Sequence, residues 1–229
     1  MSSMEIQLHS ILILGSDGTM GSELIQAFNR HDHNCHIHAF CDDPSSLPTK
    51  DYLVAKKVHR GSISSKEAIE KAINNSDADV VIVNIGIDDE KETAPTTKRT
   101  DNAQIVTNIL QGNLDVRVVV ISSLGAGKST IRLGLGVGAA LKTYMKHRLE
   151  DHTGQEQEFL EKMGDRTVIV RPTTLTEGKS TGSVKILEEG SWCSWPMIDK
   201  QDLAVFISNE VLDGDGSEKV VNVTGAKAK

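Results

Sequence analysis

The sequence predicts an α/β fold in which helices cover both faces of a doubly wound, mostly parallel β-sheet, giving three layers in a single domain. Four short apolar runs, at residues 11–14, 80–83, 118–121 and 168–170, carry this prediction. Strands this apolar are buried on both faces, as in parallel sheets. Segments of helical character separate them, and the alternation indicates βαβ units. A chain of 229 residues is long enough for one domain with its own core.

The remaining elements follow in chain order. Further strands are expected at residues 35–40, 52–58 and 219–223, and helices at 21–30, 65–74, 95–111, 141–162 and 199–212. After Arg171 the pattern loosens into a stretch rich in Thr, Ser and Gly, which we interpret as a cover over a substrate. The substrate-side segments are therefore expected near residues 129–146 and 173–198 of the single domain 1–229.

Composition and charge exclude several functions. The chain has 25 Lys and Arg against 32 Asp and Glu, a net charge of -7, and only two Trp, two Tyr and four Phe. It lacks the basic surface and the stacking side chains of nucleic-acid binders, so no nucleic-acid partner is expected. No apolar stretch approaches the roughly 18 residues that cross a bilayer, so no membrane partner is expected either. Three cysteines without CxxC spacing suit a reducing compartment and predict a cytoplasmic protein. The oligomeric state cannot be derived from the sequence.

A glycine-rich turn, Gly15-Ser16-Asp17-Gly18-Thr19-Met20-Gly21, directly follows the first apolar run and opens a helix. Glycines permit a tight turn and let backbone N–H groups approach a pyrophosphate, while the helix N-terminus favours the anion. The alternative is a purely structural turn. Because this one lies between strand and helix in an alternating chain, it predicts dinucleotide binding.

The glycine spacing, GxxGxxG, resembles that of the extended and atypical short-chain dehydrogenase/reductase superfamily. Residues 119–128 (VVISSLGAGK) are similar to the SSxG segment of its NmrA-like and biliverdin-IXβ-reductase/flavin-reductase-like branch, and residues 168–178 (VIVRPTTLTEG) resemble its TIVRPxxLTxG segment. Asp151 and Glu156 fall where this branch commonly carries a D(K/H)xxxE helix. The resemblance spans roughly residues 11–207 and implies a Rossmann fold with NAD(P) lying across the strand ends.

The resemblance also implies which residues contact the nucleotide. The glycine turn would carry the phosphates, with Gly15, Ser16, Asp17, Gly18, Thr19, Met20 and Gly21. Ser62 and Ile63 would lie by the adenine, and Asn84, Ile85 and Gly86 beside the ribose and phosphates. Ser122 and Ser123, with Pro172, Thr173, Thr174 and Leu175, would line the nicotinamide end.

Asp42 carries the prediction of cofactor preference. It follows the second strand about 20 residues beyond the glycine turn, where an acidic residue can accept hydrogen bonds from the ribose hydroxyls. The branch often carries Arg at this position, to pair with a 2′-phosphate that a carboxylate would repel. We therefore expect NAD(H) to be preferred over NADP(H). Two alternatives are that Asp42 only caps the following turn, and that Arg60 rescues NADP(H) binding.

The catalytic residues of the superfamily are not all present. Its reductases use Ser with a Tyr whose pKa is lowered by a Lys four residues on. The only YxxxK match, Tyr52 to Lys56, precedes the Ser segment and is rejected. Ser123 and Tyr144 are the catalytic candidates, although Arg148 stands four residues after Tyr144. Tyr144, Arg148 and His152 share a helical face, which forms either a catalytic stripe or a solvated basic surface.

Two other patterns are set aside. Gly125 to Thr130 ends like a phosphate loop, but Ser122 stands where the first glycine would be required. His31, His33, Cys35, His36, His38 and Cys41 are potential metal ligands, but they span a helix end and a strand whose side chains alternate between faces. No metal is expected.

The sequence therefore predicts an NAD(P)-dependent oxidoreductase that reduces a small conjugated or carbonyl substrate by hydride transfer. Tyr144, Trp192 and Trp195 on the expected substrate side favour a flat, conjugated molecule. The alternative is a non-catalytic, NmrA-like redox sensor that binds the dinucleotide without turning it over. A nucleotide-sugar epimerase is disfavoured, because it needs a larger carboxyl-terminal domain and the missing Tyr/Lys pair. The identity of the substrate and the source of the proton cannot be read from the sequence.

Overall fold

The computed structural model describes residues 9–86, 94–133, 143–214 and 218–226. Its centre is an eight-stranded sheet of order β3-β2-β1-β4-β5-β7-β12-β9, in which only β9 runs antiparallel to its neighbour. The strands of this sheet are β1 (Ser10–Leu14), β2 (His36–Cys41), β3 (Lys57–Arg60), β4 (Val80–Val83), β5 (Arg117–Ile121), β7 (Thr167–Pro172), β9 (Val184–Ile186) and β12 (Val220–Gly225). Two small parallel pairs lie outside it: β6 (Arg132–Leu133) with β10 (Trp192–Cys193), and β8 (Thr174–Thr176) with β11 (Met197–Asp199).

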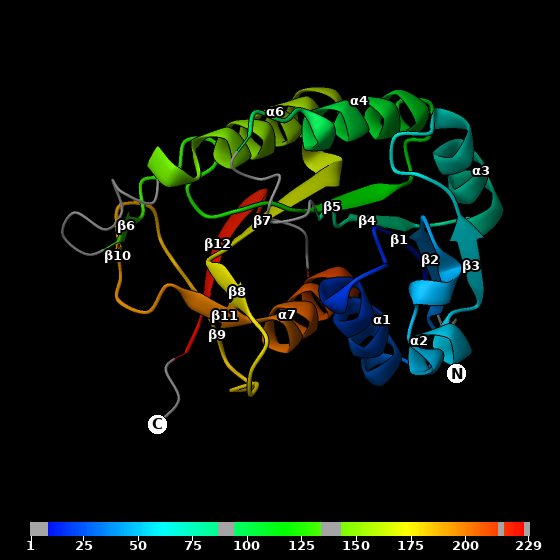
Figure 1. The fold of residues 1–229 in the computed structure, drawn as a ribbon, viewed down its shortest axis with the longest axis horizontal. Helices are drawn as coiled ribbons and strands as arrows, with labels where there is room; N and C mark the ends of the chain where they lie inside the picture. Colours follow the sequence, from blue (N-terminus) through cyan, green and yellow to red (C-terminus); the bar gives the residue numbers. More distant parts are fainter. Residues whose placement is uncertain (1–8, 87–93, 134–142, 215–217, 227–229) are drawn as a thin grey trace, which may run out of the picture.

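Helices cover both faces of the sheet and produce the three expected layers (Figure 1). One face carries α3 (Lys66–Ser76), α4 (Lys98–Leu110) and α6 (Lys146–Met163), and the other carries α1 (Thr19–His31) and α7 (Lys200–Leu212). The short α2 (Thr49–Val54) lies beside α1. Single 3-10 turns, η1 (Pro44–Ser46) and η3 (Gly164–Arg166), complete the described elements. The α/β, doubly wound prediction is confirmed.

The core consists of two apolar layers, separated by the sheet. Ile11 and Ile13 of β1 face the layer under α1 and α7, whereas Leu12 and Leu14 face the layer under α3, α4 and α6. All four side chains are fully buried. Successive strand residues point to opposite faces, so an uninterrupted apolar run is what a two-sided core requires.

The strand order reverses at β1, which pairs with β2 on one side and β4 on the other. The connections leaving the carboxyl ends of β1 and β4 therefore diverge and leave a crevice between them. In open α/β sheets, ligands bind at such a switch point. The glycine turn follows β1 and Asn84 follows β4, so both lie at this crevice.

The strand expected at residues 52–58 is wrong for residues 52–56 and confirmed only for residues 57 and 58. Pro48 precedes a helix, α2, and its fixed backbone angle suits that position. Asp51 is buried on the inner side of α2 and accepts a hydrogen bond from Gln26 of α1 (2.7 Å), while Tyr52 and Leu53 point to solvent. Only Lys57–Arg60 pairs with β2. Helix contacts with α1 thus outweigh the strand preference of the local side chains.

Helix α6 begins at Lys146, later than the expected start at residue 141. Residues 141 and 142, and the part of the expected substrate-side segment at 134–142, lie outside the described residues. No described helix combines the length and the apolar character that a membrane span requires.

Candidate functional site

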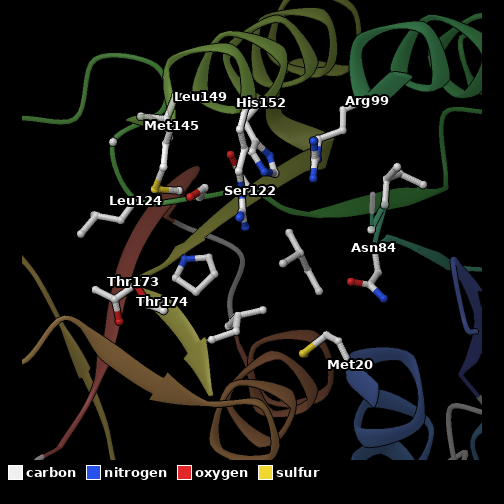
Figure 2. A pocket seen from close by; sticks show the side chains of 18 of the residues that line it. Met20, Asn84, Arg99, Ser122, Leu124, Met145, Leu149, His152, Thr173 and Thr174 are labelled. Carbon is white, nitrogen blue, oxygen red and sulfur yellow. The ribbon is translucent and has the colours of Figure 1, made fainter. Parts of the chain in front are cut away.

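A cavity of about 800 Å³ opens along the carboxyl ends of the central strands. Its walls come from the glycine turn, from the segments that follow β4, β5 and β7, and from the first turns of α4, α6 and α7. Figure 2 shows Met20 and Asn84 on one side of it and Leu124, Thr173 and Thr174 on the other. These segments, far apart in the sequence, line one continuous space.

The glycine turn adopts a conformation that depends on its glycines. Gly15 has φ +80°, and a Cβ there would lie 1.9 Å from the carbonyl oxygen of Asn84. Gly18 has φ +116°, a region that other residues rarely adopt. At Gly21 a Cβ would lie 2.3 Å from the carbonyl oxygen of Ser16, so this glycine lets α1 pack closely under the turn. A different steric constraint thus requires glycine at each of the three positions of the GxxGxxG pattern.

The start of α1 is open to an anion. The first turn of this helix contains no acidic residue, and no side chain caps it. Its unpaired N–H groups and the helix dipole favour a negative group. Asp17, Gly18, Thr19 and Met20 line the cavity here. The residues present therefore fit a nucleotide phosphate.

Ser16 and Asn84 hold the turn in place. The Ser16 hydroxyl donates to the carbonyl of Ile13 (2.7 Å) and accepts from the N–H of Phe40 (3.0 Å), so Ser16 is buried and turned away from the cavity. Asn84 lines the cavity, and its amide donates to the carbonyl of Gly15 (2.8 Å). Ile85 and Gly86 follow it along the wall. Gly15, Ser16 and Gly21 shape the turn but do not line the cavity.

The two serines after β5 differ. The Ser122 hydroxyl donates to Glu156 (2.5 Å), and that carboxylate also forms a two-point ion pair with Arg171 (2.9 and 2.6 Å). Ser122 is therefore committed to a buried polar network, although it borders the cavity. The Ser123 hydroxyl makes no hydrogen bond within the described part of the chain and also borders the cavity. Ser123 is the serine that can contact a ligand.

The segment after β7 forms the opposite rim. Pro172, Thr173, Thr174 and Leu175 all line the cavity. The Thr173 side chain is buried, with its hydroxyl 3.0 Å from that of Thr224. Thr174 to Thr176 pair with β11, which fixes this rim beside the start of α7.

Tyr144, Arg148 and His152 all line the cavity, but they do not form one helical stripe. Tyr144 precedes α6 and is 73% exposed, so it lies at the rim. Arg148 and His152 lie one turn apart on α6. His152 is 4% exposed, and burial, reinforced by the charges of Arg99 and Arg148, holds its pKa well below the usual range. The catalytic role of Tyr144 remains a prediction.

The residues expected at the adenosine end lie outside the cavity. Asp42 is exposed after β2, and Ser62 and Ile63 lie between β3 and α3. Asp43, and not Asp42, caps the following turn, because its carboxylate accepts from the N–H of Ser45 (3.0 Å). Burial and the charges of Asp17, Asp43 and Asp42 raise the pKa of the Cys41 thiol to about 11. Three carboxylates therefore act on the end of β2, while the guanidinium of Arg60, at the end of β3, acts on Asp43 and lowers the pKa of that carboxyl after its hydrogen bonds with Ser45.

Lys200 was missed by the sequence analysis. It is the first residue of α7, and its ammonium contacts Glu177 and the hydroxyl of Thr19 across the rim of the cavity. Thr19 also donates to Glu177 (2.7 Å). Lys200 and Thr19 are separated by 181 positions, so only the tertiary structure reveals their contact.

Three further features that the sequence singled out lie away from the cavity: the two tryptophans, Gly127 and the histidines of β2. Trp192 and Trp195 are exposed and do not line the cavity, so of the three aromatic residues only Tyr144 borders it. Gly127, from the sequence that mimics a phosphate loop, lies against the Glu156–Arg171 pair, where a Cβ would come within 2.2 Å of Arg171. His38 pairs with His59 (3.0 Å).

The fold, the switch-point cavity and the glycine turn define an NAD(P)-binding Rossmann protein. The chain belongs to the NAD(P)H-binding family whose model matches residues 15–213.

Solved structures share this fold. ChuY, an anaerobillin reductase from Escherichia coli O157:H7, is 18% identical with a TM-score of 0.74, over 96% of this chain and 98% of that one. A short-chain dehydrogenase/reductase from Veillonella parvula, solved with NADP, is 16% identical with a TM-score of 0.74, over 94% of each chain. A protein assigned as an NADH-flavin reductase from Streptococcus pneumoniae is 13% identical with a TM-score of 0.71, and the match covers 96% of this chain and 100% of that one. A comparison of the sequence with curated proteins found no match.

Proposed function

We propose that this protein is an NAD(P)H-dependent reductase of a small conjugated or carbonyl substrate. The observation that carries the proposal is the single cavity that joins the open N-terminus of α1 to the unpaired hydroxyl of Ser123. Bound NAD(P)H supplies the hydride. Its phosphates would lie against residues 17–20 and its nicotinamide near Ser123 and residues 172–175.

The protein side chains have distinct roles in this proposal. Ser123 donates a hydrogen bond to the substrate oxygen or to the nicotinamide, because its hydroxyl has no competing partner in the described structure. Tyr144 closes the exposed rim over a flat substrate. Lys200 places a cation beside Thr19, where it pairs with a phosphate in exchange for Glu177. Leu124, Met145 and Leu149 offer the apolar surface that a conjugated ring requires (Figure 2).

Asp42 supports a preference for NAD(H). Within the described residues its carboxylate makes no hydrogen bond, since the turn is capped by Asp43, and it remains available to the ribose hydroxyls. Asp17, Asp42 and Asp43 bring three carboxylates to this end of β2, and their charge would oppose a 2′-phosphate, whereas Arg60, which acts on Asp43, is the cation that would favour one. The prediction of a role for Ser62 and Ile63 near the adenine stays part of this proposal.

Turnover tests the proposal directly. NADH oxidation is followed at 340 nm with a panel of flavins, quinones, linear tetrapyrroles and small carbonyls, next to a titration of the protein with NADH and NAD⁺. We expect saturable, substrate-dependent oxidation of NADH. Binding of the dinucleotide without turnover across the panel would contradict the enzyme.

That second result would instead support a dinucleotide-binding redox sensor. Two observations favour this alternative. The Ser122 hydroxyl is bound to Glu156 and Tyr144 is exposed, and the described cavity lining contains no Tyr/Lys pair of the kind that a standard reductase site uses. A sensor should discriminate NAD⁺ from NADH in affinity, whereas an enzyme need only bind both.

A further inference from the structure

An acidic side chain of the protein itself lies beside the start of α1. Glu177, which follows β8, accepts a hydrogen bond from the Thr19 hydroxyl (2.7 Å) and pairs with the Lys200 ammonium (2.5 Å). Thr19 is the first residue of α1 and Lys200 the first of α7, two helices that lie side by side (Figure 1). Helix N-termini favour anions. Glu177 is therefore an internal anion next to the expected position of a nucleotide phosphate.

Glu177 occupies the partners of a phosphate and not the phosphate position itself. Thr19 and Lys200 line the cavity, whereas Glu177 does not, so the carboxylate holds them from the outer side of the rim. Within the described part of the chain it accepts no hydrogen bond from the backbone of the glycine turn. The backbone N–H groups of the turn thus remain open to a ligand, while one hydroxyl and one ammonium are already in use.

The backbone on both sides of Glu177 is fixed, but its side chain is not. The Thr176 hydroxyl donates to the carbonyl of Ile198 (3.3 Å), and the N–H of Gly178 donates to the Asp199 carboxylate (2.8 Å). These contacts anchor the segment to β11 and to the start of α7. The Glu177 side chain itself is 61% exposed. Releasing Lys200 and Thr19 therefore needs the rotation of one exposed side chain, which is a fast motion.

The charge of Glu177 opposes a phosphate at this place. Hydrogen bonds from Lys200 and Thr19, with the positive charge of Lys200, hold the pKa of the Glu177 carboxyl below its usual range, so it is an anion at neutral pH. A diphosphate at residues 17–20 brings a second anion to the same ammonium and hydroxyl, and the two anions repel each other. Because a diphosphate carries more negative charge than one carboxylate, the ammonium is more strongly attracted to it.

We propose that Glu177 is an internal competitor of the dinucleotide phosphates and sets the affinity of the site for them. In the free protein it holds Lys200 and Thr19. When a diphosphate binds, the ammonium and the hydroxyl pass to the phosphate oxygens and the carboxylate turns into solvent. This inference rests on the proposed function, because it concerns the phosphate end of the same cavity. A purely structural clasp between β8, α1 and α7 would instead stay closed in the complex.

Titration with ADP-ribose, which has the diphosphate but no nicotinamide, tests this competition by calorimetry. Glu177→Gln should bind it about fivefold more tightly than the wild type, the size of one exposed ion pair. In a Lys200→Met background the same substitution should change the affinity less than about twofold, because no ion pair is left to break. Glu150→Gln is the control, since Glu150 is similarly exposed (59%) and also faces a lysine, Lys146, but does not line the cavity. It should leave the affinity unchanged.

Unchanged or weaker binding by Glu177→Gln would show a structural clasp and overturn the proposal. Equal gains in both backgrounds would also overturn it, because they indicate repulsion without exchange of Lys200. The reductase proposal fails separately, since it is read from turnover: ADP-ribose binding without turnover contradicts the enzyme and leaves these criteria intact. If neither the wild type nor Glu177→Gln binds ADP-ribose, the dinucleotide site and the competitor are both contradicted. Should Lys200→Met fail to fold, Lys200→Gln is used under the same criteria.

Discussion

At the scale of single residues, adjacent side chains in this protein have opposite tasks. Ser122 and Ser123 follow the same strand, but one hydroxyl is bound to Glu156 and the other is open to the cavity. Successive residues at a strand end point to different sides, so neighbours of identical chemistry meet different surroundings. The roles of the two adjacent serines therefore have to be predicted and tested separately.

Ser123→Ala should lower the turnover of an accepted substrate by about a hundredfold, as loss of one positioned hydrogen-bond donor does. Its melting temperature should stay close to that of the wild type. Ser122→Ala should instead lower the free energy of unfolding by about 1–3 kcal/mol, because it leaves the buried Glu156 with one partner fewer. Steady-state kinetics and thermal unfolding of both variants separate the two roles. Unchanged turnover in Ser123→Ala would remove Ser123 from the mechanism.

Asp42→Arg should reverse the nucleotide preference. The carboxylate that accepts from ribose hydroxyls is lost, and a guanidinium that pairs with a 2′-phosphate replaces it. We expect NADPH to bind at least tenfold more tightly and NADH more weakly, measured by fluorescence titration. Asp115→Arg makes the same charge change just before β5, at the far end of the sheet, and is the control. Equal or tighter binding of NADPH by the wild type would refute the preference.

At the scale of elements, the D(K/H)xxxE segment of α6 acts mainly as a structural tie. Asp151 accepts hydrogen bonds from the first turn of α4, where N–H groups have no partner within the helix. Glu156 joins α6 to β7 through Arg171 and to β5 through Ser122. Only His152, between them, faces the cavity. In this segment, Asp151 and Glu156 therefore hold the elements around the cavity together, and His152 lines the cavity itself.

Asp151→Ala should destabilise the protein by about 1–3 kcal/mol, because two backbone donors at the start of α4 lose their acceptor. Chemical denaturation measures the change. Glu150→Ala, the exposed neighbour on the same helix, is the control and should stay within about 0.5 kcal/mol of the wild type. A loss no larger than that of the control would show that α4 does not depend on this contact.

Element boundaries were partly predictable. Four apolar runs located β1, β4, β5 and β7, because burial on both faces demands such runs. Residues 52–56 do not form the expected strand, since Gln26 of α1 pairs with Asp51 of α2 and no local pattern contains that contact.

At the scale of the whole molecule, buried histidines make the fold sensitive to acid. His38 and His59 stack between β2 and β3, and burial together with neighbouring positive charges lowers the pKa of His38 to about 4 and lowers that of His59. A histidine with a lowered pKa is neutral in the fold. Its contribution to stability is complete above the unfolded pKa near 6.5 and is lost as the pH falls toward 4.

We expect the free energy of unfolding to fall by about 3 kcal/mol from His38 alone between pH 7 and pH 4. Denaturation at a series of pH values measures this. The double variant His38→Leu/His59→Leu replaces both partners with apolar side chains and should make the profile less steep, while the buried His152 keeps its own contribution. His33→Gln removes an exposed histidine and should not. A profile that is the same in the double variant and the wild type would contradict the assignment.

The sequence by itself determined the fold class and the nucleotide-binding turn, because both depend on local patterns. Buried strands require apolar runs, and a turn with φ +80° and +116° requires Gly15 and Gly18. Only the tertiary structure decided which polar residues share the cavity. Lys200 meets Thr19 across 181 positions, and Arg99 of α4 approaches His152 of α6. The physical reason is that charge and hydrogen bonding act through space, so the sequence contains the residues of the site but not their juxtaposition.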